Sequence, residues 1–264
     1  MQNLLKFIGL LFLFGLFNGG VSTVSASKAI SHTIFDNLLQ KHVTPAGAVN
    51  YKGFIQDKQL FEEYLTLLQN NHPDKKNWSK NEQLAYWINA YNAFTVKIII
   101  DNYPTKSIKD IKSGIPFINS VWDIKFINIE GQEYDLNNIE HTILRKEFDE
   151  PRIHFAINCA SYSCPKLHTR AFTAKGLEEQ LVERTRDFFA DKQKNNIISK
   201  DKVVLSSIMK WYSTDFTDKG FFSWLFGGKE RSENLIKFIN PYVDIALSPN
   251  AEIEFMDYRW DLNE

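Results

Sequence analysis

The residues with the most chemical potential lie in a short segment that runs from His154 to Pro165. It places a histidine, an asparagine, two cysteines and three hydroxyl side chains close together in the chain. A cysteine thiolate is a strong nucleophile, and a histidine base oriented by an amide or a carboxylate is its usual activator. The segment therefore makes Cys159 a candidate nucleophile, with His154 as a candidate base and Asn158 as a candidate orienting group.

The spacing of these side chains sets a condition on that chemistry. Side chains alternate along a strand and return every three to four residues along a helix, so His154 and Asn158 share a face in either structure. Cys159 does not share that face, and a dyad with His154 requires the chain to turn near Cys159. Residues 160–165 favour a turn, and unpaired backbone N–H groups at such a turn would lower the pKa of the thiol.

A second group of polar residues precedes this segment. Asn137, His141 and Arg145 recur every fourth residue, on a more polar helix face than the one that carries Ile139 and Ile143. Such a face could present His141 to a cleft as an alternative base for Cys159, with the neighbouring Glu140 as an orienting carboxylate. The competing interpretation is a partly buried structural histidine.

Two amides interrupt an otherwise apolar helical pattern further upstream. Asn89 and Asn92 lie within the sequence Trp-Ile-Asn-Ala-Tyr-Asn-Ala. A buried amide is costly unless it is hydrogen-bonded, so we expect both to have specific partners and to brace neighbouring loops.

The N-terminus predicts export. Lys6 precedes the apolar run from Phe7 to Phe17, and the small residues Val24-Ser25-Ala26 follow, which is the layout of a secretory signal peptide. We expect a signal peptide at residues 1–26, a single domain at residues 27–264 and a periplasmic or secreted product. An uncleaved membrane anchor is the alternative; after cleavage no stable membrane span is expected.

Export bears on the two cysteines, because an oxidising compartment favours a disulfide between nearby thiols. A Cys159–Cys164 disulfide would close a small loop and stabilise the fold by about 2 kcal/mol. A thiolate metal site completed by His141 or His154 also fits the spacing, although no paired metal-binding motif supports it. A nucleophile, a structural disulfide and a metal site are thus all compatible with the residues.

The remaining chain must supply the elements that hold these residues. Hydrophobic periodicity predicts helices at residues 29–42, 58–71, 80–102, 137–147, 175–192, 206–213 and 231–240. It predicts hairpins at residues 121–136, with a turn at Glu130-Gly131, and at residues 197–205, and strands at residues 153–158 and 253–260. The order lacks a regular βαβ rhythm, so we expect an α+β fold: a single helix-rich domain with a small, mainly antiparallel sheet.

Composition limits the partners. The chain has 31 basic and 32 acidic residues and a formal net charge of −1, without a basic cluster interleaved with aromatic residues. Nucleic acid is therefore not an expected partner. The sequence predicts no cofactor, and it leaves the substrate or protein partner unknown.

Several of these motifs together resemble the DUF547 family, a domain of unknown function. The similarity covers about residues 80–190, and the closing segment from Met256 to Asn263 also resembles bacterial members of the family. It rests on residues 85–93, 139–141, 154–161 and 163–165 of this sequence. The resemblance implies a fold and a site and leaves the reaction open.

The family's distribution bears on Cys159. Members also occur inside eukaryotic cells, some fused to glutaredoxin and DEP modules, where a structural disulfide is unexpected. Plant relatives keep a cysteine at the position of Cys159 but often have serine at that of Cys164, which implies a role for Cys159 that needs no disulfide. The helix with Asn92 is also faintly similar to that of transglutaminase-like and papain-like enzymes, but it lacks their nucleophilic cysteine.

These observations favour a cysteine-dependent enzyme, a hydrolase or an acyl or amidotransferase, with thiol redox chemistry as a variant. Cys159 is the expected nucleophile, His141 or His154 the base, and Asn158 or Glu140 the orienting group. The rival hypothesis is a non-enzymatic exported binding domain with a structural Cys159–Cys164 disulfide.

Overall fold

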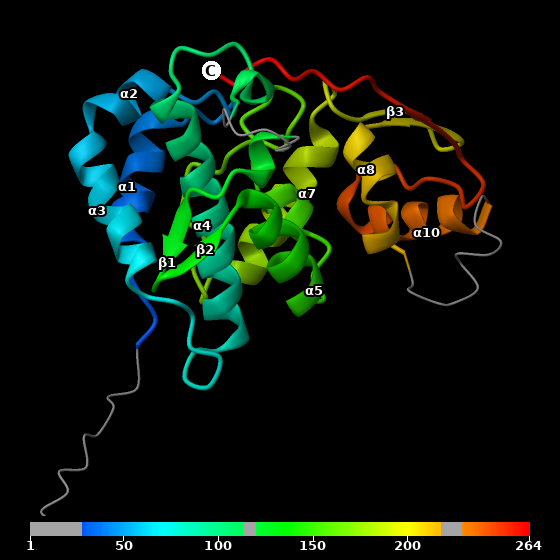
Figure 1. The fold of residues 1–264 in the computed structure, drawn as a ribbon. Helices are drawn as coiled ribbons and strands as arrows, with labels where there is room; N and C mark the ends of the chain where they lie inside the picture. Colours follow the sequence, from blue (N-terminus) through cyan, green and yellow to red (C-terminus); the bar gives the residue numbers. More distant parts are fainter. Residues whose placement is uncertain (1–27, 113–119, 218–228) are drawn as a thin grey trace, which may run out of the picture.

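The computed structural model describes residues 28–112, 120–217 and 229–264 (Figure 1). The expected signal peptide at residues 1–26 lies outside these ranges, and it stays a prediction.

Helix α4 (Lys80–Asp101) is the central element of the fold. Its start is fixed by a capping box, in which the Ser79 side chain accepts from the Glu82 N–H and the Glu82 carboxylate accepts from the Ser79 N–H. Every residue from 83 to 96 is buried, because the apolar residues are not confined to one stripe. A helix with no solvated face must be surrounded by other elements, and α4 is.

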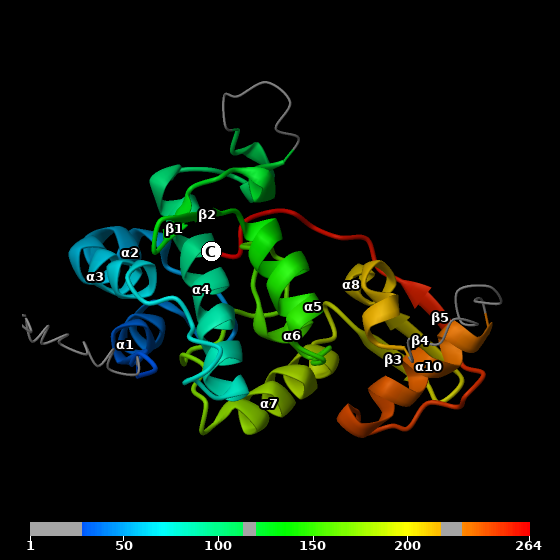
Figure 2. The ribbon, with the colours of Figure 1, turned by 60° about the horizontal axis from the view of Figure 1, so that its bottom comes forward.

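Three helices cover one side of α4. They are α1 (Thr33–His42), α2 (Tyr51–Gln56) and α3 (Lys58–Gln69), and Figure 2 shows them grouped beside α4. The predicted helices at residues 29–42, 58–71 and 80–102 are confirmed, whereas α2 lacked a recognised signal. Aromatic and aliphatic side chains from these helices form the larger of two hydrophobic cores.

A short hairpin lies against this core. Strands β1 (Ile127–Ile129) and β2 (Gln132–Tyr134) pair antiparallel, and Glu130 and Gly131 form the turn with φ of 48° and 82°. Positive φ at both positions is the geometry of a tight hairpin turn, as expected for this sequence. The strands are shorter than predicted, and residues 121–123 form a 3₁₀ turn, η2 (Val121–Asp123). Another such turn, η1 (Ile108–Asp110), precedes it.

The second half of the chain builds a separate, smaller core. Helix α7 (Leu177–Ala190) leads into strands β3 (Asn196–Ser199) and β4 (Lys202–Leu205), which pair antiparallel. Helices α8 (Ser207–Trp211) and α10 (Lys229–Ile239), the 3₁₀ turns η4 (Ser213–Asp215) and η5 (Asn240–Tyr242) and strand β5 (Glu252–Phe255) complete it. The α+β class is confirmed, but the described strands form two small sheets, and β5 joins β4 in parallel.

The predicted strand at residues 153–158 is wrong. Residues Ile153–Ala156 form a short helix, α6, and the chain becomes extended at Ile157. A strand needs a neighbour to satisfy its backbone. Here the Asn92 side chain takes that place, because it donates to the Ala156 carbonyl (2.9 Å) and accepts from the Asn158 N–H (2.8 Å).

The last residues connect the two cores. After β5 the chain crosses from the smaller core back to the larger one, as the red trace shows in both views (Figures 1 and 2). We call residues 256–264 the C-terminal strap. Its backbone bonds three separate segments: Tyr162 N–H donates to the Asp261 carbonyl (2.7 Å), Val49 N–H to that of Asn263 (2.8 Å), and Leu262 N–H to that of Lys106 (3.0 Å).

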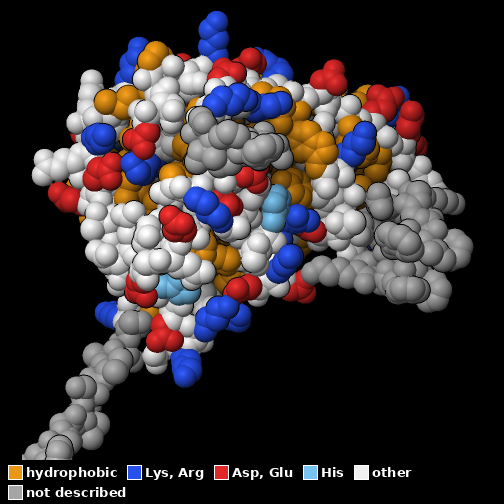
Figure 3. Space-filling model, viewed as in Figure 1, with side chains coloured by type: hydrophobic (Ala, Val, Ile, Leu, Met, Phe, Trp, Pro, Cys, Tyr) orange, Lys and Arg blue, Asp and Glu red, His pale blue; other side chains and the backbone are white. Residues whose placement is uncertain are grey.

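Basic and acidic side chains are interspersed over the face of the molecule in Figure 3. Within the described ranges, no helix combines the length and apolar character needed to span a bilayer.

Candidate active site

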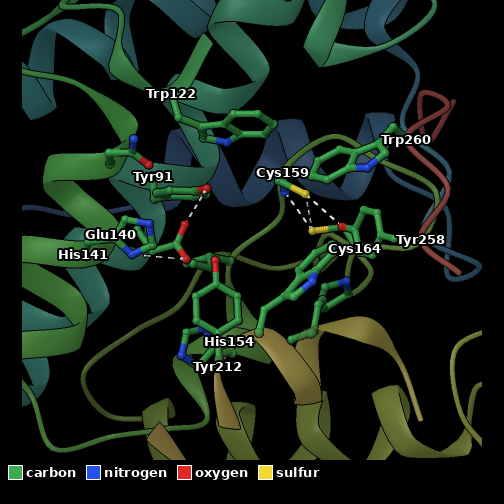
Figure 4. A pocket seen from close by; sticks show the side chains of 15 residues that line it. Tyr91, Trp122, Glu140, His141, His154, Cys159, Cys164, Tyr212, Tyr258 and Trp260 are labelled. Atoms are coloured by element: carbon green, nitrogen blue, oxygen red, sulfur yellow. Dashed lines mark hydrogen bonds and ion pairs between the residues drawn. The ribbon is translucent and has the colours of Figure 1, made fainter. Parts of the chain in front are cut away.

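A cavity of about 330 Å³ lies where the two cores and the C-terminal strap meet (Figure 4). The larger core provides one part of the wall through α4, η2 and the helical segment after β2, and the smaller core provides another through α8 and the residue after it. The α6 segment, the loop that follows it and the strap complete the wall. The lining side chains are Tyr91, Trp122, Asn137, Glu140, His141, His154, Ile157, Cys159, Cys164, Pro165, Ile208, Trp211, Tyr212, Tyr258 and Trp260.

Cys159 begins a tight loop whose backbone is held by amide side chains. The next residue, Ala160, has φ of 58°, a left-handed conformation that costs a non-glycine residue of order 1 kcal/mol. Asn158 holds this turn, because its side chain accepts from the Ala160 N–H (2.9 Å) and donates to the Pro165 carbonyl (2.7 Å). The predicted turn at Cys159 is therefore present, and Asn158 shapes the turn instead of orienting a histidine.

The Cys159 sulfur has three polar neighbours. The sulfur of Cys164 lies 2.8 Å away, and the hydroxyls of Ser161 and Tyr258 each lie 3.2 Å away. These two hydroxyls are also bonded to each other (2.8 Å), so one of them donates to the other. Both cysteines are free thiols in this structure. Cys159 is half-buried and Cys164 is buried, so the two thiols differ in their access to the cavity.

These contacts separate the acidities of the two thiols. The hydrogen bond from Cys164 lowers the pKa of Cys159, with further help from the Ser161 and Tyr258 hydroxyls, while burial acts against it. Burial, followed by the hydrogen bond to Cys159, raises the pKa of Cys164 well above its ordinary value. Cys159 is therefore the thiol that ionises first and Cys164 the one that keeps its proton.

The backbone contributes less than the sequence suggested. In the loop, the Cys159 N–H donates to the Cys164 sulfur (2.9 Å), and the Ala160 N–H is taken by Asn158. The N–H groups of Tyr162 and Ser163 donate to carbonyls of the C-terminal strap. The expectation of unpaired N–H groups beside the thiol is wrong for these residues, because the strap and the loop itself use them.

His154 is buried and engaged elsewhere. Its Nε2 lies 2.8 Å from the Asp215 carboxylate, and its ring stacks on Tyr212 with centroids 4.0 Å apart. Asp215 also receives two hydrogen bonds from the Arg145 guanidinium, at 2.5 and 2.9 Å. Burial favours a raised pKa for Asp215, but the bonds and charges of His154 and Arg145 outweigh it and hold that pKa well below its usual range.

His141 and Glu140 face the cavity from one helical segment. Residues Asn138–Leu144 form a π-helix, η3, which continues into α5 (Arg145–Glu147). The helix predicted at residues 137–147 is present, but the sequence did not predict that most of it is a π-helix. π-Helical turns are rare and recur at functional sites. His141 is partly exposed, with Nδ1 3.1 Å from Arg145 and 3.9 Å from the Glu140 carboxylate.

Glu140 is a buried carboxylate with tyrosine neighbours. Tyr91 donates a hydrogen bond to it (3.0 Å). Burial, and then the charge of Glu140, raise the pKa of Tyr91 and of Tyr212, and a hydrogen bond to Glu140 adds to the effect on Tyr212. These phenols therefore stay protonated and act as donors.

The candidate residues are thus gathered in one cavity, but not as a dyad. Among the residues that the structure describes, no hydrogen bond joins the Cys159 sulfur to a histidine nitrogen. Figure 4 shows the thiols with Tyr258 on one side and Glu140, His141 and Tyr212 on the other.

The two amides of α4 are buried, and both have the hydrogen-bond partners expected from the sequence. Asn89 bonds the N–H and the carbonyl of Phe172, at 2.9 and 2.8 Å, and Asn92 bonds the Ala156 carbonyl and the Asn158 N–H.

Several residues of the site were not identified from the sequence, because no local motif marks them as functional. Asp215 and Tyr212 come from the smaller core, and Trp211 precedes them on α8. Tyr258 and Trp260 belong to the strap, where the family-like closing segment was the one available hint. Over the described ranges, no group of three histidine, cysteine or acidic side chains could hold a metal ion, so the metal alternative gains no support.

Fold and site together define an α+β protein with a thiol-bearing pocket between two cores. Residues 75–189 match the model of the DUF547 family, described as a protein of unknown function. This match supports the resemblance in the sequence, over less than half of the chain. It includes both cysteines, Glu140 and both pocket histidines, and it excludes α8 and the strap. No curated protein and no solved structure matches the chain.

Proposed function

We propose that this protein is an exported cysteine-dependent enzyme, a hydrolase or acyltransferase, with Cys159 as its nucleophile. One observation carries the proposal: the Cys159 sulfur lines the cavity beside the Cys164 thiol and a bonded pair of hydroxyls, and hydrogen bonds from these groups favour its thiolate. A purely structural cysteine needs neither a cavity nor a lowered pKa, whereas a nucleophile needs both. The left-handed Ala160 beside it is a further cost that a functional turn explains.

The chemistry follows from where the thiolate sits. Cys159 would attack a substrate carbonyl carbon, and the bond to the leaving group would break with transfer of a proton to that group. Water or another acceptor would then lose a proton and release the acyl group from the sulfur. His141 is suited to transfer these protons, because it is partly exposed in the same cavity and lies close to the Glu140 carboxylate.

His154 is a weaker candidate for the base. Its Nε2 is bonded to Asp215 and its ring is covered by Tyr212, so a role in positioning Tyr212 and Arg145 fits it better. The tyrosine hydroxyls of the cavity stay protonated, and they are suited to donate to a developing oxyanion.

A second candidate is thiol–disulfide exchange, favoured by the 2.8 Å between the two sulfurs and by their opposite pKa shifts. Cys159 would attack a substrate disulfide, form a mixed disulfide and release one substrate thiol. Cys164 would then attack the Cys159 sulfur and release the second thiol. The substrate disulfide is reduced to two thiols while the protein dithiol is oxidised to a disulfide.

The test is alkylation by iodoacetamide under nonreducing conditions, followed by mass spectrometry across a pH series. We expect labelling of Cys159 with a midpoint below the ordinary cysteine pKa of about 8.5. Cys159→Ser should abolish this labelling without loss of the fold, and Cys164→Ser should keep it, because a serine hydroxyl can still donate to the sulfur. If neither cysteine reacts before reduction and both variants are equally destabilised, the pair is a structural disulfide and the proposal fails.

Export rests on the N-terminal pattern alone. N-terminal sequencing of the mature protein should begin at or near Ser27, and a full-length chain in washed membranes would instead identify an anchor.

A further inference from the structure

The pocket carries a negative charge that its own side chains do not neutralise. Among the described residues that line it, Glu140 is the one acidic side chain, and it is buried. It accepts a hydrogen bond from Tyr91, which is neutral, and the pKa of the Cys159 thiol is lowered, so ionisation adds a second negative charge. His141 is the nearest potential cation, and it is charged only when protonated.

The cations nearest the pocket bond other groups than the Glu140 carboxylate. Arg145 is bonded to Asp215, contacts the Tyr212 ring, 5.1 Å from its centroid, and donates to Nδ1 of His141 (3.1 Å), from where its charge acts on Glu140 without a direct hydrogen bond. Lys109 lies over the Trp260 ring, 4.8 Å from its centroid. Neither Arg145 nor Lys109 lines the cavity. The rings of Tyr212 and Trp260 thus contact protein cations that do not line the cavity, and among the described residues Glu140 has no direct ion pair with a lysine or an arginine.

The rest of the wall is mostly aromatic. In the part of the chain that the structure describes, its aromatic side chains other than histidine are Tyr91, Trp122, Trp211, Tyr212, Tyr258 and Trp260. Three of them form a cluster at one side: Trp211 stacks on Trp260 (6.1 Å between centroids, 17°), and Tyr258 packs against both, at 4.8 and 4.5 Å. Trp211 is 50% exposed, an unusual state for so large an apolar ring.

We infer from this arrangement that the pocket binds substrates that carry an ammonium group, held against the aromatic rings beside Glu140. Aromatic faces attract cations through the ring quadrupole, and a carboxylate has more acceptor sites than Tyr91 and Tyr212 occupy. A neutral or apolar ligand would remove the Glu140 charge from water and give it no cation in direct contact. An ammonium ligand supplies both the charge and the missing donors.

This inference rests on the proposed function and gives it a substrate class. Figure 4 places Glu140 and Cys159 on opposite sides of one small cavity, so an ammonium at Glu140 puts the adjoining part of the ligand near the sulfur. A volume of about 330 Å³ lies at the lower end for ligand pockets, and it suits a short chain. The class that fits is an acyl group with a nearby amine, as in an amino acid or a peptide N-terminus.

The test compares two thiol reagents of opposite charge on the full mature chain with Cys164→Ser. Aminoethyl methanethiosulfonate is cationic and sulfonatoethyl methanethiosulfonate is anionic. Each forms a disulfide with the Cys159 thiolate and releases methanesulfinate, and the serine hydroxyl that replaces the Cys164 thiol cannot displace the adduct. Rates are measured at about pH 8, where an unperturbed histidine is neutral, and divided by the rates for free mercaptoethanol.

We expect the normalised ratio of cationic to anionic rates to be at least roughly tenfold above unity, because a buried charge near the thiol acts in a low dielectric. Glu140→Gln should reduce this ratio by roughly the same factor. Removing Glu140 also changes the thiolate population, but that change affects both reagents equally and cancels in the ratio. Glu133→Gln, on the exposed face of β2, is the matched control for overall charge and should leave the ratio unchanged.

If Glu140→Gln does not fold, Trp260→Leu gives an independent reading, and it should lower the cationic rate relative to that of neutral methyl methanethiosulfonate. A ratio near unity, or a raised ratio that neither substitution changes, overturns the ammonium inference while Cys159 remains a reactive thiol. Failure of all three reagents to modify the folded protein overturns the proposed nucleophile instead.

Discussion

The two sides of the pocket are built by different physical means. On the thiol side, Cys159 is held by amide side chains, backbone bonds and neutral hydroxyls, and most of these come from the turn and the C-terminal strap. On the opposite side, the Asp215 carboxylate forms an ion pair with the Arg145 guanidinium and also lies within hydrogen-bond distance of His154. Neutral hydrogen bonds fix a geometry at any pH near neutrality, whereas an ion pair changes with protonation.

The two sides therefore have different roles. The thiol side sets the position and ionisation of the nucleophile, and its donors act on the sulfur directly. The charged side fixes Tyr212 and Arg145, which contact the partly exposed His141 and the Glu140 carboxylate. Loss of a neutral partner and loss of a charged partner should therefore have effects that differ in their pH dependence.

The largest effect is expected for Asn92→Leu, beneath the thiol side. The substitution strands the buried Ala156 carbonyl and the Asn158 N–H, at roughly 1–3 kcal/mol for each group. We expect the free energy of unfolding in urea to fall by about 3 kcal/mol, by the same amount at pH 5 and pH 8. Asn81→Leu, at the exposed start of α4, is the control and should change stability by less than about 0.5 kcal/mol. Equal stability of the Asn92 variant and the wild type would mean that this amide does not hold the turn.

Asp215→Asn should produce the next largest effect, on the charged side. It leaves the buried His154 and the Arg145 guanidinium without their carboxylate, and since this site is partly solvated we expect a loss of about 2 kcal/mol near pH 7. The folded pKa of Asp215 is depressed, so its contribution is complete above its unfolded pKa of about 3.9 and disappears as pH falls through the lower folded pKa.

The difference in unfolding free energy between wild type and Asp215→Asn should therefore shrink below about pH 4. Asp101→Asn removes an exposed ion pair with Lys97 and should cost no more than about 0.5 kcal/mol. A difference that is constant across the acid range would show that the Asp215 charge does not support this side.

The smallest effect is expected for Tyr258→Phe. It removes one hydroxyl of the bonded Ser161–Tyr258 pair beside the Cys159 sulfur and preserves most of the ring packing. We expect the pKa of Cys159 to rise, seen as a shift to higher pH in the appearance of thiolate ultraviolet absorbance. Tyr212→Phe removes a hydroxyl from the opposite side and should leave that pKa closer to the wild-type value. A larger shift in the Tyr212 variant would reverse the assignment of the two sides.

Local elements of the fold followed from local patterns. The capping box and the continuous apolar run predict α4, and the Glu130-Gly131 pair predicts its hairpin turn, because both depend on neighbours within a few residues. The strand prediction was wrong at residues 153–156 because it, too, used only neighbouring residues. Their apolar pattern is compatible with a strand, but a strand needs a partner strand, and the Asn92 side chain occupies that position instead.

The site divides in the same way. Local sequence patterns predict that Cys159, Cys164, His154 and Asn158 lie near a turn, and that His141 and Glu140 share a helix. Which groups meet depends on the tertiary fold: Tyr258 contacts the Cys159 sulfur from 99 residues away, and Asp215 bonds His154 from 61 residues away. Periodicity and turn chemistry act over a few residues, whereas these contacts depend on how two hydrophobic cores and a connecting strap pack together.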